Sequence, residues 1–270
     1  GAIYALGNVT ISANSTLSDN EVSDGDGGAI FAEGNVTISN STLNNNFAGQ
    51  DGGAVMTSGI LNVSSSTLSG NISHQHGGAL RGFQNVTILD STLSGNEANW
   101  NGGALYVVGA SGNTRNTTVT NSTFADNKAL GTSELSGNGG AIYGYGTITS
   151  TRSTFTNNSA LLHGGAVFSE LAGVGGTVDV SNSTLRGNKA LAASSEGGAI
   201  HAHNGKVLFS TFVNNTASTD VGGILGDSIK KTGDGEFEIG ANIFAGDAAR
   251  AQLGIGASPT PFTDLGGNVF

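Results

Sequence analysis

Acidic and imidazole side chains recur at a spacing of 25 residues in the first third of this chain. Asp26, Asp51 and His76 each stand directly before a Gly-Gly pair. The later Gly-Gly pairs are preceded by Asn101, Asn138, His163, Glu196 and Val221. If the chain stacks with this period, the two carboxylates lie about 5 Å apart, with the imidazole beyond them. Paired carboxylates can perform acid–base or nucleophilic glycoside chemistry, so Asp26, Asp51 and His76 are the candidate catalytic residues.

Two other interpretations of these acids stay open. Asp24 and Asp26 flank a glycine and could bind Ca²⁺, although two residues supply fewer than the six oxygens that calcium takes. Alternatively, the acids are ordinary solvated turn residues. We expect no further metal or cofactor site, and the absence of cysteine excludes disulfide bonds and thiolate zinc sites.

The elements that would position these residues follow from two motifs that share one period. Gly-Gly-Ala-[Ile/Leu/Val] starts at residues 27, 52, 77 and 102, and it returns, finally as Gly-Gly-Ile-Leu, at residues 139, 164, 197 and 222. Ser-Thr-[Leu/Phe]-x-x-Asn starts at residues 15, 41, 66, 91, 122, 153, 183 and 210. Short β-rich runs, such as 36–38, lie between the two motifs. Three short strands per coil of about 25 residues, with no helical period, predict an all-β parallel β-helix (β-solenoid) of about nine coils.

The period also predicts the domain organisation. Residues 1–228 form the parallel β-helix repeats, and residues 229–270, which hold both prolines, form a degenerate last coil and a C-terminal cap. The chain starts in the middle of a Gly-Gly-Ala-Ile motif, so we expect the natural protein to extend further toward its N-terminus. Extra residues enter at 109–115, 130–138, 171–176 and 191–196, and coils four to seven are therefore the expected recognition region.

Charge and composition exclude several classes of partner. The net charge is −10, the pI is near 4.7, and only 10 Lys and Arg residues are scattered along the chain. These values argue against binding of nucleic acid or of anionic membrane surfaces. No apolar run reaches the length of a membrane span, so no membrane insertion of this segment is expected.

A second column of residues is the candidate binding face. Because side chains alternate along a strand, the residue after each inward Ile, Val or Leu of the Gly-Gly-Ala motif should point outward. These residues are Tyr4, Phe31, Met56, Arg81, Tyr106, Tyr143, Phe168 and His201. A row of outward rings could bind sugar rings or the apolar surface of a partner. Alternatively, the rings stack on one another and only protect the sheet.

The Ser-Thr motif supplies two further columns. Its Thr residues should face outward, and a flat Thr-rich face is a feature of ice-binding solenoids, but Arg152 and Phe209 interrupt the neighbouring column two positions earlier. Its terminal Asn residues, from Asn20 to Asn215, should form a corner ladder, because Asn tolerates left-handed backbone and its amide can bond to the amide of the next coil.

The pairing of Gly-Gly-Ala-[Ile/Leu/Val] with Phe-x-x-Asn, seen at residues 124–127, 155–158 and 212–215, resembles the repeat pair of the chlamydial polymorphic membrane proteins. The Leu form of the other five coils is similar to repeats of the broader pectin-lyase-like secreted bacterial proteins. The resemblance implies a right-handed β-helix and an autotransporter adhesin, secreted or at the bacterial cell surface, that binds a cell-surface protein or glycan. A carbohydrate-active enzyme (polysaccharide lyase or hydrolase) is the alternative. A structural solenoid, either ice-binding or forming fibres by self-association through its coil ends, is the second alternative.

Overall fold

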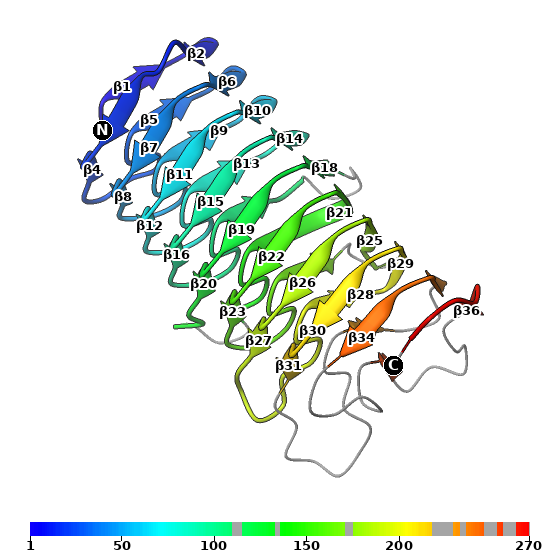
Figure 1. The fold of residues 1–270 in the computed structure, drawn as a ribbon. Helices are drawn as coiled ribbons and strands as arrows, with labels where there is room; N and C mark the ends of the chain where they lie inside the picture. The colour runs from blue at the N-terminus through cyan, green and yellow to red at the C-terminus, as the bar shows by residue number, and fades with distance from the viewer. Residues whose placement is uncertain are drawn as a thin grey trace.

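The computed structural model describes residues 1–109, 115–132, 136–170, 175–217, 229–232, 236–245, 253–255 and 263–269. Within these ranges the fold is all-β, and successive coils stack along one axis with the two chain ends at opposite ends of the stack (Figure 1). The sheets are built from parallel pairs of strands. The predicted parallel β-solenoid is confirmed. The part of the chain described here has no helix long and apolar enough to cross a lipid bilayer.

Each regular coil contains four strands rather than the predicted three. In the second coil these are β5 (Ile30–Ala32), β6 (Val36–Ser39), β7 (Thr42–Asn44) and β8 (Phe47–Ala48). Strands at the same place in successive coils form a ladder, and we label the four ladders A to D in this order. Ladder C contains nine strands, which agrees with the prediction of about nine coils. The fourth strand escaped prediction because two residues are too short to show an alternating pattern.

The remaining strands extend these ladders. Ladder A also contains β1 (Ile3–Ala5), β9 (Val55–Thr57), β13 (Leu80–Gly82), β17 (Leu105–Val107), β21 (Ile142–Thr151), β24 (Val167–Glu170), β28 (Ile200–Ala202), β32 (Ile229–Lys231) and β35 (Leu253–Ile255). Ladder B contains β2 (Val9–Ile11), β10 (Leu61–Ser64), β14 (Val86–Leu89), β18 (Arg115–Thr120), the long β21 shared with ladder A, β25 (Thr177–Ser181), β29 (Asn204–Leu208), β33 (Phe237–Gly240) and β36 (Thr263–Asp264). Ladder C contains β3 (Thr16–Ser18), β11 (Thr67–Ser69), β15 (Thr92–Ser94), β19 (Thr123–Ala125), β22 (Thr154–Thr156), β26 (Thr184–Arg186), β30 (Thr211–Val213) and β34 (Ile243–Ala245). Ladder D contains β4 (Glu21–Val22), β12 (Ile72–Ser73), β16 (Glu97–Ala98), β20 (Lys128–Ala129), β23 (Ser159–Ala160), β27 (Lys189–Ala190) and β31 (Thr216–Ala217).

The core runs along the inside of the stack. Ile30, Val36 and Leu43 of the second coil are fully buried, and the same positions of later coils are buried in register with them. In the middle of the rod the inward residue of ladder C is Phe, and the rings of Phe124 and Phe155 stack with their centroids 5.1 Å apart. Because every coil supplies only a thin layer, each layer depends on its neighbours for burial.

Two ladders of polar side chains hold the corners. Asn46 donates from Nδ2 to Oδ1 of Asn71 at 2.9 Å, and Oδ1 of Asn71 also accepts the backbone N–H of Asn46 at 3.0 Å. This confirms the predicted Asn ladder. The left-handed backbone was assigned to the wrong residue, however, because Asn45 and Gly70, directly before the ladder residues, have the positive φ values of 54° and 62°. The Ser residues of the Ser-Thr motifs from Ser41 to Ser210 form a second buried ladder, which the sequence analysis did not predict.

The Gly-Gly pair makes the turn that leads into ladder A. Gly52 has a φ of 62°, a conformation that glycine adopts without steric cost. Gly53 must be glycine for a different reason, because a Cβ there would collide with the backbone oxygens of Gly78 and Ile72. The first glycine thus allows a tight turn, and the second lets ladder D of the next coil approach the turn closely.

Parallel pairing continues beyond residue 228. Ile229 pairs with Ile200, Phe237 with Gly205, and strand β34 lies in register with β30. Strands β32, β33 and β34 therefore extend ladders A, B and C. Of the four predicted insertions, only 191–196 is described in full. Residues 110–114, 133–135 and 171–174 of the other three lie outside the described residues, as do residues 218–228.

Candidate functional site

The structure brings the two predicted columns together on the outer face of ladder A. We call Tyr4, Phe31, Met56, Arg81, Tyr106, Tyr143, Phe168 and His201 the ring column. We call the residues before the Gly-Gly pairs, from Asp26 to Glu196, the turn column. Ile30 points into the core and Phe31 points out of it, as expected. The tight turn at each Gly-Gly pair then lays the turn column beside the outward side chains of ladder A.

The ring column is a continuous stack in the middle of the rod. The centroids of Tyr106 and Tyr143 are 4.9 Å apart, those of Tyr143 and Phe168 are 5.1 Å apart, and those of Phe168 and His201 are 5.0 Å apart. All four residues are at most 9% exposed. The rings therefore bury one another, and solvent reaches little of their faces. The binding role of the column stays a prediction.

The turn column packs against the ring column of the following coil. Asp51 forms an ion pair with Arg81, and its Oδ1 accepts the backbone N–H of His76 at 2.9 Å. The ring of His76 stacks on Tyr106 with centroids 4.1 Å apart. Of the three candidate catalytic residues, Asp51 thus has both carboxylate oxygens engaged and His76 is held in a ring stack. Their role in catalysis stays a prediction, and in this arrangement each carboxylate oxygen of Asp51 already has one partner.

Burial controls the ionisation of these groups. It lowers the pKa of His76 to about 4, so the ring is neutral near pH 7. It raises the pKa of Asp26, and the positive charge of Arg81 opposes that rise. Burial also raises the pKa of the Tyr143 hydroxyl, which donates a hydrogen bond to Oε2 of Glu170 at 2.6 Å. His76, Tyr106 and Tyr143 are therefore uncharged near pH 7, and their rings can pack together without burying a charge.

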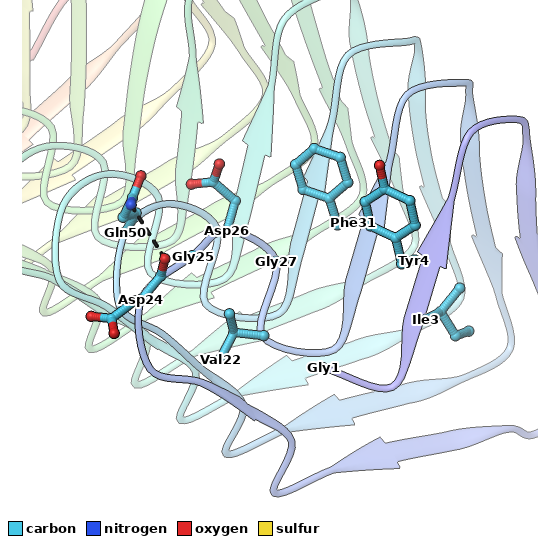
Figure 2. A pocket seen from close by; sticks show the side chains of 10 residues that line it. All are labelled: Gly1, Ile3, Tyr4, Val22, Asp24, Gly25, Asp26, Gly27, Phe31 and Gln50. Carbon is cyan, nitrogen blue, oxygen red and sulfur yellow. Dashed lines mark hydrogen bonds between the residues drawn. The ribbon is translucent and has the colours of Figure 1, made fainter.

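A pocket of about 450 Å³ lies at the N-terminal end of the two columns (Figure 2). Its wall includes the stacked rings of Tyr4 and Phe31, whose centroids are 5.4 Å apart, and the predicted calcium ligands Asp24 and Asp26. Oδ1 of Asp26 accepts the backbone N–H of Asp51 at 3.0 Å. Gln50 completes this side of the pocket, and its amide donates to the backbone oxygen of Asp24. The pocket combines two aromatic faces with two carboxylates, and calcium binding stays a prediction.

A second group of polar side chains lies further along the columns. Ligand atoms of His163, Glu196 and His201 lie within 4.8 Å of one another. Nζ of Lys230 donates to Oε1 of Glu196 at 2.7 Å, and Nδ1 of His163 accepts the backbone N–H of Glu196 at 3.2 Å. Burial lowers the pKa of both imidazoles. At His201 the positive charges of His163 and Lys230 lower it further, while a backbone contact with Glu196 acts the other way.

Sequence reasoning placed these residues in two separate columns and did not bring them together. The available signal was the Gly-Gly turn itself, since a tight turn into a strand must place the preceding side chain beside the strand's outer face. The sequence analysis placed Lys230 in the degenerate last coil and cap and gave it no role; in the structure β32 pairs with β28 in ladder A and brings the lysine beside Glu196.

The model of the Chlamydia polymorphic membrane protein repeat matches the chain at residues 90–108, 121–145 and 152–170. The matched stretches contain two of the three Phe-x-x-Asn copies and one copy of the Leu form. They confirm the resemblance in the repeats and cover a minor part of the chain. No curated protein and no solved structure matches it.

Proposed function

We propose that this chain is a surface-displayed interaction rod of the adhesin type. The observation that carries the proposal is the match of three coils to the repeat of the Chlamydia polymorphic membrane proteins. The stack of parallel coils supports it, because a solenoid presents a long surface whose outward residues are free to vary while the inward residues maintain the core (Figure 1). The same proposal includes that the rod is secreted or displayed on the bacterial cell surface.

The ligand that we propose is a neutral or weakly basic glycan, bound at the turn of Trp100. The indole is half-buried, and its plane stands at 79° to the ring of His76. An indole face can pack against the apolar side of a sugar ring. Gln50 and Gln75, at the same place in the two preceding coils, provide amide groups that can bond to sugar hydroxyl groups. The net charge of −10 argues against a polyanionic glycan.

The buried part of the ring column is unsuited to a binding test. Tyr106 and Tyr143 are 9% and 8% exposed, so their replacement by alanine removes packing and lowers stability. A loss of binding in those variants would not separate contact from folding. Trp100→Ala is a cleaner test, because this side chain lies half-buried at a turn outside the core.

The experiment measures binding of the purified rod to arrays of neutral, basic and acidic glycans and to cultured cells. Trp100→Ala is expected to weaken glycan binding about tenfold, the effect of losing roughly 1.4 kcal/mol of contact. Phe209→Ala is the matched control, because this ring is 62% exposed and follows a strand of ladder B, and it should bind as the wild type does. Equal binding by the wild type and Trp100→Ala would refute the glycan site. Release of soluble sugars that Asp51→Asn abolishes would refute the adhesin proposal in favour of an enzyme.

A further inference from the structure

Three side chains with metal-binding atoms converge from two consecutive coils. His163 and Glu196 precede the Gly-Gly pairs at residues 164 and 197, and their backbones pair as an isolated parallel bridge. His201 belongs to β28, in the same coil as Glu196. The backbone pairing therefore fixes the first two residues one above the other, and ladder A fixes the third beside them.

One polar atom in this group lacks a well-aligned hydrogen bond with the described residues. Nδ1 of His201 is inaccessible to solvent, the residue as a whole is 8% exposed, and only the backbone of Glu196 interacts weakly with the ring. The nearest carboxylate oxygen, Oε2 of Glu196, is 4.0 Å away, beyond hydrogen-bond distance. A buried polar atom without a well-aligned hydrogen bond is costly, so the atom points to a ligand that would satisfy it.

We propose that His163, Glu196 and His201 bind a divalent transition-metal ion, with Zn²⁺ as the best-fitting probe, and that the ion links the two coils. Two imidazole nitrogens and one carboxylate oxygen are a donor set that zinc takes in three-residue sites, where a water or another ligand fills the fourth position. Ca²⁺ and Mg²⁺ take oxygen ligands, so this set discriminates against them.

The geometry needs only a small adjustment. Ligand atoms about 2.0–2.2 Å from a tetrahedral ion stand roughly 3.3–3.5 Å from one another. The ligand atoms now lie up to 4.8 Å apart, so they must approach one another by about 1 Å to bind the ion. Rotation of the half-buried side chains of His163 and Glu196 can supply this movement. Phe168 stacks on His201 and fixes the plane of its ring.

Lys230 is the competitor for this site. Its ammonium group holds Oε1 of Glu196 at 2.7 Å and is only slightly exposed. A cation in the site would lie close to this charge, so the lysine neutralises Glu196 in the metal-free state and opposes binding of the ion. Removal of the lysine charge should strengthen metal binding, whereas removal of an imidazole should weaken it.

The test is a calorimetric titration of the tag-free chain with Zn²⁺, with Co²⁺ absorption spectra to report the coordination. His163→Asn and His201→Phe place at these positions the residues that the preceding coil carries, Asn138 and Phe168, so both variants should keep the fold. Each is expected to lower the affinity for Zn²⁺ at least tenfold, and Lys230→Met to raise it about tenfold. His74→Asn, at an exposed histidine of another coil, is the control and should leave the affinity unchanged.

Thermal melts without metal verify that the variants fold, and saturating Zn²⁺ should raise the melting temperature of the wild type but not of His163→Asn. The proposal is overturned if the wild type shows no saturable binding of one Zn²⁺ ion. It is also overturned if His163→Asn binds as the wild type does while His203→Asn, at the histidine that shares a small surface pocket with His201, loses binding.

Discussion

Asn96 occupies the middle of the Asn ladder, and its replacement by alanine should destabilise the rod strongly. Its Oδ1 accepts both the backbone N–H and the Nδ2 of Asn71, at 3.0 and 2.9 Å. Its Nδ2 donates to the carbonyl oxygen of Leu68 at 3.1 Å and to Oδ1 of Asn127 at 2.9 Å. All four partners belong to the buried corner, and Asn96 itself is 0% exposed.

The magnitude follows from what alanine leaves behind. One backbone N–H and one amide proton of Asn71 lose their acceptor in a site closed to water. Oδ1 of Asn127 keeps one partner, because it also accepts the backbone N–H of Asn96, which alanine retains. Two orphaned donors at about 1–3 kcal/mol each give an expected loss of roughly 3–5 kcal/mol. A loss of this size is a large fraction of the stability of an ordinary domain.

Asn20 provides the matched control, since it is the first residue of the same ladder. Its Nδ2 donates to Oδ1 of Asn46 and to the carbonyl oxygen of Ser18, and its site is only partly buried. Asn20→Ala should therefore cost about 1 kcal/mol, because no buried donor loses its acceptor. Urea unfolding followed by far-ultraviolet circular dichroism measures both variants. An Asn96→Ala rod that is no less stable than Asn20→Ala would refute the reasoning.

Three further predictions concern the turns and the rings. The pKa of His76 is 6.5 in the unfolded chain and about 4 in the folded one. Protonation therefore favours the unfolded chain: the free energy of unfolding is unaffected above pH 6.5, decreases as the pH falls from 6.5 to about 4, and is constant below that. At pH 5 the wild type should have lost about 1–2 kcal/mol that His76→Asn, measured by urea titration at each pH, does not lose. Gly78→Ala should destabilise the rod by more than about 3 kcal/mol, since the new Cβ meets the backbone of Gly103 and Glu97, while Gly7→Ala, with open space around it, should change the unfolding midpoint little. Phe209→Asn should raise stability by about 0.5–1 kcal/mol in a thermal melt, because φ is 50° at this exposed position and Asn tolerates the left-handed region better than Phe; an unchanged or lower melting temperature would contradict this.

The period of the sequence was sufficient to predict the repeated architecture. A motif that returns every 25 residues, with short β-rich runs and no helical period, is typical of a β-helix coil, and the register Ile30↔Val55 and Leu43↔Leu68 follows directly from that spacing. Inward and outward positions followed from alternation within each strand. The two-residue strands of ladder D could not be predicted, because their pairing is imposed by the coils above and below and leaves no local pattern.

The candidate site was only partly predictable for a different physical reason. Each column could be read from the sequence, because members of a column are equivalent positions of successive coils. The distance between two columns depends on the backbone of the Gly-Gly turn, and a positive φ at Gly52 rotates Asp51 over ladder A. Sequence analysis therefore identified Asp51 and Arg81 but treated them as members of separate surfaces.

The same coupling suggests where specialised chemistry can enter a repeat protein. Between Asn138 and Lys230 the two columns change from neutral amide and phenyl groups to His163, Glu196 and His201, while Ile142, Val167 and Ile200 beneath them keep the core unchanged. Each new side chain meets the new side chain of the next coil, because the turn column reaches one coil forward, as Glu196 does toward Lys230. Substitutions in consecutive coils therefore combine into one cluster without any change of backbone. A rod of this kind can acquire a metal site or lose it through a few outward residues, independently of the coils that maintain its fold.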